Sequence, residues 1–197
     1  MPRQPIKPRS AAQDDWLVGG DRRAAAAERI YAAAAELIVS QGLDDFSVDT
    51  LADLVHCSRA TIYRHAGGKA EIRDAVLIRT SARILDRVRV AVSDLTGSER
   101  VVTAIMLALK LIRSDPLSRL MIGSIHGAHD GGWLTESAIV AGFATDVIGL
   151  AEPDPPAAQW LIRVVLSLLY WPAGDSDTEY QMVQRFVGPT FVGNSRT

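Results

Sequence analysis

Cysteine is nearly absent from this 197-residue chain, in which Cys57 is the single thiol. One cysteine excludes an internal disulfide framework and fits a reducing compartment. No apolar run reaches the roughly 18 to 20 residues that a membrane-spanning helix needs, and the N-terminus lacks an apolar signal-peptide core. The sequence therefore predicts a cytoplasmic protein with no membrane partner.

Common catalytic and metal-binding motifs are also missing. The sequence has no Gly-rich phosphate loop, no nucleophile elbow and no HExxH pair. His126 and His129, followed by Asp130, have a spacing that metal ligands can have, but no third or fourth ligand is identified. We therefore expect no enzyme, no metal site and no cofactor.

Overall charge does not identify a partner, because the formal net charge is only −2. Local charge is more informative. Residues 59–89 carry eight Lys and Arg against three acids, whereas the chain beyond residue 98 is acidic. The arginines between 79 and 89 also fit a solvated helix face. A hydrophobic content of 48% provides an ample core for one compact unit or two small helical ones.

Two short helices separated by a tight turn are predicted between residues 47 and 66. Ser47 and Ser58 each precede an amphipathic run, where a hydroxyl can accept a free backbone N–H. The first run repeats apolar residues at the helical period, and the second directs Ile62 inward. This pattern is typical of a DNA-binding helix-turn-helix.

The outward residues of the second short helix suit double-stranded DNA. Arg binds guanine or phosphate, Thr and Tyr hydroxyls bind phosphate, and a small Ala allows close approach to the groove. Lys69 follows Gly67-Gly68 at the next helix N-terminus, where it can clamp a phosphate. The candidate DNA-binding residues are Ser47, Ser58, Arg59, Ala60, Thr61, Tyr63, Arg64, His65 and Lys69.

This region resembles the N-terminal domain of the TetR family of bacterial transcriptional regulators. The residues that carry the resemblance are Ser47-Val48-Asp49, Leu51-Ala52, Ser58, Thr61-Ile62-Tyr63, His65, Lys69 and Ala75-Val76-Leu77. Residues 28–46 look like the first helix of that family, with Gly42 just beyond its end. The resemblance implies an all-α fold: a three-helix DNA-binding domain with the helix-turn-helix, and a C-terminal helical domain for ligand binding and dimerisation.

Three positions depart from the family pattern. His56 stands where the turn glycine is usual, Ala66 replaces an aromatic residue, and Ala70 replaces an acid. We expect modest backbone strain at His56, since His tolerates positive φ better than most residues. Cys57 has two interpretations, a small hydrophobic residue packed in the turn or a thiol that senses oxidants.

We expect a flexible N-terminal arm at residues 1–21, the DNA-binding domain at 22–68 and the effector-binding and dimerisation domain at 69–190. The arm contains Arg3, Lys7 and Arg9, which either contact DNA or belong to a disordered tail. Downstream helices are predicted at about 69–95, 99–112, 116–125, 133–150, 157–171 and 177–187.

The helix predicted at 157–171 has Arg163 as its single charged residue, so its apolar surface is difficult to bury completely within a monomer. In the TetR family the last two long helices pair with their symmetry mates, so the resemblance implies a homodimer that reads a palindromic operator. Candidate interface residues are Leu161, Val164, Val165, Leu168, Tyr180, Val183 and Phe186.

The middle helices contain adaptable Met and large aromatic residues that suit an apolar or aromatic small-molecule effector. Candidate pocket residues are Met106, Leu109, Leu117, Met121, Ile125, His126, Trp133, Phe143 and Trp160. The alternative is that they simply fill the core. The chain is thus interpreted as a repressor released by its ligand, or alternatively as an architectural or adaptor protein without an effector.

Overall fold

The computed structural model describes residues 15–124, 142, 144–147 and 154–191. All regular structure in these ranges is helical, which confirms the predicted all-α fold. The chain separates into two compact units, Met1–Val76 and Leu77–Thr197. Within the described ranges, no helix combines the length and the apolar character that a bilayer crossing requires.

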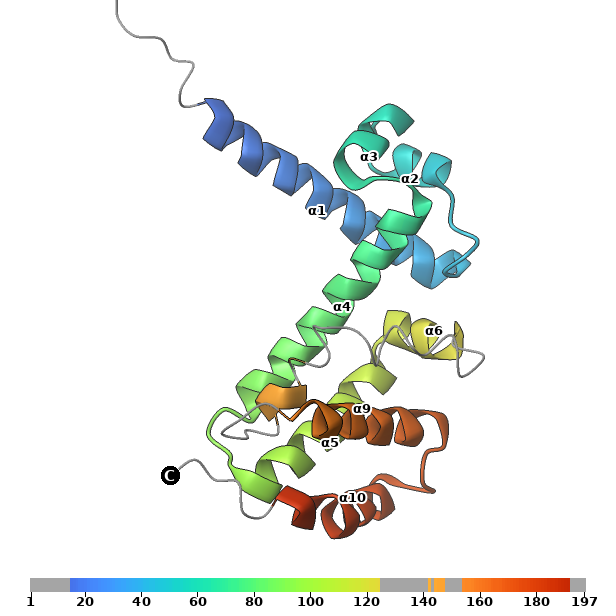
Figure 1. The fold of residues 1–197 in the computed structure, drawn as a ribbon. Helices are drawn as coiled ribbons and strands as arrows, with labels where there is room; N and C mark the ends of the chain where they lie inside the picture. The colour runs from blue at the N-terminus through green and yellow to red at the C-terminus, as the bar shows by residue number, and fades with distance from the viewer. Residues whose placement is uncertain (1–14, 125–141, 143, 148–153, 192–197) are drawn as a thin grey trace, which may run out of the picture. The chain divides into compact units, whose positions relative to one another are not determined.

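The first unit contains α1 (Asp15–Gln41), α2 (Val48–Leu54), α3 (Arg59–Ala66) and the start of α4 (Lys69–Ala91) (Figure 1). The helices α1, α2 and α3 contact one another pairwise. Their shared core consists of Ile30, Ala34, Leu37, Ile38, Phe46, Val48, Leu51, Ala52, Ile62, Ala66, Ile72 and Val76. These residues recur at helical spacing, so burial of one stripe per helix determines how the short helices pack.

The N-terminal boundary of α1 differs from the expected one. The helix begins at Asp15, so residues 15–21 are helical and do not belong to a flexible arm. Alanines at 24–27 and 32–35 have the highest helix propensity, and they offset a cost of about 1 kcal/mol for each of Gly19 and Gly20. Residues 1–14, with the three basic arm residues, lie outside the described ranges.

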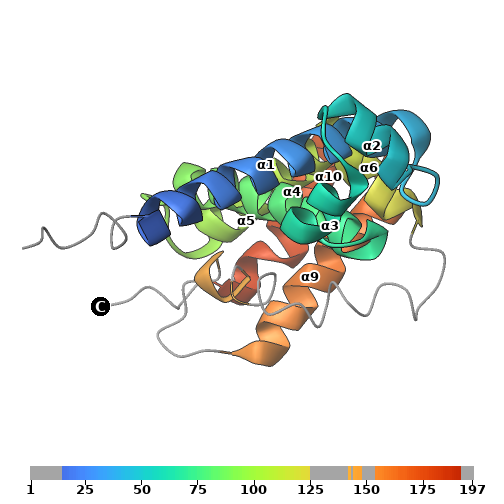
Figure 2. The same cartoon turned by 90° about the horizontal axis from the view of Figure 1, so that it is seen from above.

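The second unit is built around α5 (Gly97–Ser114). This helix contacts α6 (Pro116–Ser124), α9 (Pro155–Tyr170), α10 (Ser176–Phe186) and the 3-10 helix η1 (Gly188–Phe191), as Figures 1 and 2 show from two directions. Its buried residues are Val101, Val102, Ala104, Ile105, Ala108, Leu109 and Leu111. They occupy one broad side of α5, about half of its circumference, as expected for a helix with several neighbours on its inner side.

Capping residues explain the observed helix ends. Asp154 accepts the Ala157 N–H at 3.0 Å, so α9 begins at Pro155 and both prolines fit its first turn, two residues before the predicted start. Helix α4 ends at Ala91 rather than near residue 95. Just beyond this end, the Arg100 guanidinium donates to the carbonyls of Val92 and Leu95. Most of the helix predicted at 133–150 lies outside the described ranges.

One ion pair joins α5 to α10 in the interior of the second unit. Arg113 donates to both carboxylate oxygens of Glu179, at 2.6 and 2.7 Å, and also to the Leu168 carbonyl at 2.8 Å. Glu179, only 1% exposed, also accepts the Ala173 N–H at 3.2 Å. The hydrogen bonds from Arg113 hold the pKa of Glu179 below its usual range.

We predict that Glu179→Gln lowers the free energy of unfolding by about 2 to 4 kcal/mol at pH 7, because the half-buried Arg113 loses its charged partner. The pKa of Glu179 is lower in the folded protein than in the unfolded chain, so its ionised carboxylate stabilises the fold at pH values above the unfolded pKa. This contribution is lost as the pH falls through the folded pKa. The difference between variant and wild type should therefore shrink between about pH 5 and pH 3 in urea titrations.

Asp86→Asn is the matched control. It breaks the exposed pair between Asp86 and Arg89, and should cost less than about 1 kcal/mol. A Glu179→Gln penalty as small as that of the control, or one independent of pH, would contradict the stabilising role assigned to this ion pair.

Candidate DNA-binding site and effector cavity

Two serine caps set the starts of the helix-turn-helix helices. The Ser47 hydroxyl accepts the Thr50 N–H at 3.0 Å, and the Ser58 hydroxyl accepts the Thr61 N–H at 3.2 Å. Both predicted caps are therefore confirmed. Each serine oxygen also lies 3.0 Å from the hydroxyl of the capped threonine, so local contacts already use both hydroxyls.

The turn between α2 and α3 has a left-handed residue where the sequence predicts one. His56 has φ of 55°, and its N–H donates to the Asp53 carbonyl at 3.2 Å. The Cys57 N–H donates to the Ala52 carbonyl at 3.0 Å, and its thiol to the Ser58 carbonyl at 3.6 Å. Histidine thus adopts the conformation that glycine usually provides in this turn.

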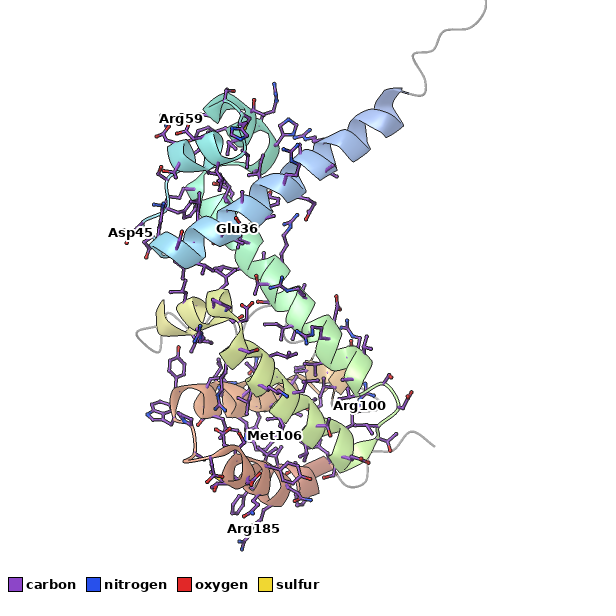
Figure 3. All side chains as sticks on the ribbon, turned by 180° about the vertical axis from the view of Figure 1, so that it is seen from behind. Glu36, Asp45, Arg59, Arg100, Met106 and Arg185 are labelled. Atoms are coloured by element: carbon purple, nitrogen blue, oxygen red, sulfur yellow. The ribbon has the colours of Figure 1, made fainter. Side chains whose placement is uncertain are left out.

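The structure places seven of the nine candidate DNA-binding residues in one continuous segment, from Ser58 to His65 on α3. Ile62 is fully buried and Tyr63 is 50% exposed. Arg59, Ala60 and Arg64 are exposed as well, and Figure 3 shows Arg59 projecting from the first unit. The helix therefore has an inner face that anchors it and an outer face that is open to a ligand as large as a duplex.

His65 is half-buried, and its Nδ1 is buried without a hydrogen-bond partner among the described residues. That edge of the ring packs against the domain. Only the other edge can face DNA, so His65 offers at most one nitrogen to a phosphate.

Arg59 forms an ion pair with Asp49 of α2. Its Nε lies 3.1 Å from the Asp49 carboxylate, and the two side chains are 60% and 64% exposed. Exposed pairs of this kind contribute at most about 1 kcal/mol, so a guanine or phosphate can replace Asp49 at small cost. The pair holds the guanidinium beside α2.

Lys69 contacts the loop that follows α1. Its ammonium donates to the Asp44 carbonyl and lies 5.3 Å from the centre of the Phe46 ring. Arg73, one turn further along α4, pairs with the Asp44 carboxylate at 3.4 Å. These contacts attach the N-terminus of α4 to the domain, and phosphate binding by Lys69 stays a prediction.

Sequence reasoning did not include Arg23 or Arg73 in the site. Arg23 on α1 donates to the Arg64 carbonyl at 3.3 Å, which brings a further cation to the end of α3. The local pattern gave no signal for Arg23, because 41 residues separate the two partners. Arg73 was detectable, since it lies one helical turn after Lys69.

Gly67 allows the chain to reverse between α3 and α4. Its φ is 82°, and a Cβ there would lie 2.9 Å from the Cβ of Glu71. Both facts require glycine at this position. The start of α4 is therefore fixed close to the end of α3.

The second unit contains a cavity of about 140 Å³. The described residues that line it are Ser81, Ile84, Leu85, Ala108, Ile112, Ser118, Met121, Ile122, Ala144, Leu161, Ile162, Val165, Leu166 and Leu169. They come from α4, α5, α6, α9 and the segment 144–147. Sequence reasoning gave weight to Met and aromatic residues and passed over most of these aliphatic ones.

The candidate pocket residues have different positions. Met121 lines the cavity, Leu109 and Leu117 are buried, and Met106 is half-buried on α5 (Figure 3). Trp160 is largely exposed, 6.4 Å from Phe191 between ring centres. The remaining candidates, Ile125, His126, Trp133 and Phe143, lie outside the described ranges.

The candidate interface residues divide between two surfaces. Leu161 and Val165 line the cavity. Val164, Leu168, Val183 and Phe186 line a groove between α9 and α10. Tyr180 and Phe186 are exposed, the latter by 66%, and Trp171 and Met182 are exposed with them. This outer surface of α9 and α10 is strongly apolar for a monomer.

The fold and the first unit together define a class of protein. A capped helix-turn-helix with an outward basic helix, followed by a separate helical unit, is the architecture of a DNA-binding regulator. Residues 30–76 match the family model for bacterial regulatory proteins of the tetR family. Residues 30–76 therefore form a DNA-binding domain of the type found in the TetR family of transcriptional regulators.

Similar proteins extend the match beyond the DNA-binding domain. An HTH-type transcriptional regulator of Mycobacterium tuberculosis is 28% identical over 184 residues, which are 90% of this chain and 91% of the relative. The structure of the TetR family repressor AlkX, from a Dietzia strain, aligns with a TM-score of 0.58 at 20% identity, over 85% of this chain and 98% of AlkX. AibR, solved with isovaleryl coenzyme A and operator DNA, aligns with a TM-score of 0.54 at 20% identity, over 80% and 97%.

We predict that His56→Val lowers the melting temperature by several degrees, whereas His56→Gly leaves it within about 2 °C of wild type. A β-branched residue is strained at positive φ, while glycine relieves strain but loses more chain entropy on folding. Thermal unfolding followed by circular dichroism measures both. Equal melting temperatures for the Val and Gly variants would show that the turn relaxes away from φ of 55°.

Proposed function

We propose that this protein is a repressor that binds a palindromic operator as a homodimer and leaves it when a small molecule occupies the cavity of the second unit. The observation that carries the proposal is the path of α4. This helix begins at Lys69, beside the helix-turn-helix, and later contributes Ser81, Ile84 and Leu85 to the cavity wall. One helix thus belongs to both units.

In this proposal α3 reads the operator. Arg59 and Arg64 contact bases or phosphates, while Thr61, Tyr63 and His65 hold the backbone. Arg23, which donates to the Arg64 carbonyl, adds positive charge at the end of the same helix, in a chain whose net charge is −2. A local excess of cations is what non-specific attraction to phosphate requires.

Dimerisation follows from the apolar outer surface of α9 and α10. Phe186, Tyr180 and Trp171 are all exposed, while Glu179 and Val183 are the buried residues of α10. A symmetric pairing of this surface would bury these rings, and it would present two copies of α3 to two half-sites.

Release requires the ligand to bind the DNA-incompatible state more tightly than the DNA-bound state. Residues of α4, α5, α6 and α9 meet at the cavity, so an occupant that alters their packing acts directly on α4. Arg83, also on α4, pairs with the Asp115 carboxylate at 3.3 Å, and Asp115 is the residue just before α6.

The named relatives support this proposal. AibR was solved with both an acyl coenzyme A and operator DNA, and AlkX is a repressor implicated in the biodegradation of n-alkanes. The alternative, an architectural protein without an effector, predicts equal affinity for all duplexes. Selection of bound duplexes from a random pool, followed by binding assays on the enriched sequence, separates the two functions.

We predict that Arg59→Ala lowers affinity for the selected operator about 5- to 150-fold and relaxes preference at one base pair, because a bidentate contact to guanine is worth about 1 to 3 kcal/mol. Lys69→Ala should weaken operator and random duplex alike, with a smaller salt dependence. Arg119→Ala, which removes an exposed arginine of the second unit, is the control and should change neither. Equal loss on both duplexes for Arg59→Ala would contradict base reading.

We predict that Phe186→Asp converts the dimer to a monomer at micromolar concentration, measured by light scattering, and abolishes operator binding. The ring is largely exposed, so the monomer fold should survive, whereas a carboxylate buried at the interface is strongly unfavourable. Gln184→Asp, two residues earlier and also exposed, is the matched control. A wild-type protein that is already monomeric under these conditions would refute the proposed dimer.

A further inference from the structure

The wall of the cavity in the second unit is almost entirely aliphatic. Twelve of its fourteen described lining residues have hydrocarbon or thioether side chains, and the other two are Ser81 and Ser118. The described lining includes no charged residue and no aromatic ring. The wall therefore offers dispersion contacts and very few hydrogen bonds.

The two serines differ in their freedom to bind a ligand. The Ser118 hydroxyl donates to the Asp115 carboxylate at 2.7 Å, so its proton is already used. The Ser81 hydroxyl makes no hydrogen bond with the described residues. One neutral polar group on a ligand can therefore be satisfied at Ser81, as donor or acceptor.

Four charged residues near the cavity are already paired with one another within the protein. Asp115 also pairs with Arg83 at 3.3 Å, and Arg113, next to the lining residue Ile112, is held by Glu179. A carboxylate or phosphate that entered the cavity would find no available cation among the described lining residues. Its desolvation would be uncompensated, which is strongly unfavourable.

The volume limits the part of an occupant that the wall can cover, because the cavity is partly open. An apolar cavity of about 150 Å³ stays dry and binds a molecule of about six carbons. Water is disfavoured in such a site because it needs two to four polar partners. A cavity of about 140 Å³ with two serines thus suits a compact organic molecule better than water.

We propose that the ligand of this cavity is a small uncharged hydrocarbon-like molecule of about six to eight non-hydrogen atoms, with at most one neutral oxygen, placed at Ser81. This inference rests on the proposed function of the second unit as the effector-binding part. It narrows that function to neutral apolar effectors and excludes acids whose charged group enters the cavity.

Cyclohexanol and hexanoate are suitable probes, because they have similar size and differ in charge. Cyclohexanol should raise the melting temperature of the full-length protein by several degrees as its concentration passes the dissociation constant. Hexanoate at the same concentration and pH 7 should produce no shift. A hexanoate shift as large as that of cyclohexanol would overturn the proposal.

Variants that fill the cavity test its location. Ala108→Leu and Ser81→Leu each place a larger side chain on the wall, and each should remove the cyclohexanol shift. Ala91→Leu makes the same change at an exposed position of α4 and should keep it. Two filled variants are used because one of them can be destabilised by overpacking. A shift that persists in every folded variant would overturn the assignment to this cavity.

Operator binding, measured separately, distinguishes this inference from the proposed function. Loss of the cyclohexanol shift in the filled variants supports the assignment of this ligand class to the cavity, whatever happens to operator affinity. An operator affinity that cyclohexanol leaves unchanged would instead refute release through this cavity. Failure of the protein to select any operator would refute the proposed function, but it would not change what the melting temperatures say about the ligand of the cavity.

Discussion

The ion pair between Arg113 and Glu179 is the constraint on which the arrangement of the second unit depends. Glu179 is buried, so its charge is tolerable only while Arg113 donates two hydrogen bonds to it. The same guanidinium binds the Leu168 carbonyl on α9, and the same carboxylate binds the Ala173 N–H between α9 and α10. One pair thus fixes α5, the last turn of α9 and the start of α10, because any large shift of these segments would strand a buried charge.

Because α9 is fixed in this way, its two faces line two different surfaces. Leu161, Ile162 and Val165 contribute to the cavity, whereas Trp160, Val164 and Ser167 contribute to the groove beside α10. The cavity face of the helix carries no charge, and its single charged residue, Arg163, lies on the groove side. The apolar character that the sequence assigns to a dimer interface therefore serves the cavity as well.

Local signals made the helix ends of the first unit predictable, whereas contacts between distant residues were not predictable in either unit. Ser47, Ser58 and Gly42 determine helix ends within three or four residues of themselves, and all three act as predicted. The partners of Lys69, Arg23 and Glu179 lie 25 to 66 residues away, so no spacing rule could supply them. The cavity illustrates the same difficulty, because five separate segments contribute isoleucine, leucine and alanine that look like ordinary core residues in sequence.

The size of the cavity restricts how a ligand could control DNA binding. The best small ligands gain at most about 1.5 kcal/mol per non-hydrogen atom, which limits an occupant of six to eight atoms to roughly 9 to 12 kcal/mol. Moving a two-state equilibrium from 1:99 to 99:1 requires about 5.5 kcal/mol of differential affinity. Roughly 45% to 60% of the available binding energy must then be specific to one state. A cavity with the same shape in both states could not supply this difference, so the two states must differ in the cavity wall, to which Ile84 and Leu85 of α4 contribute.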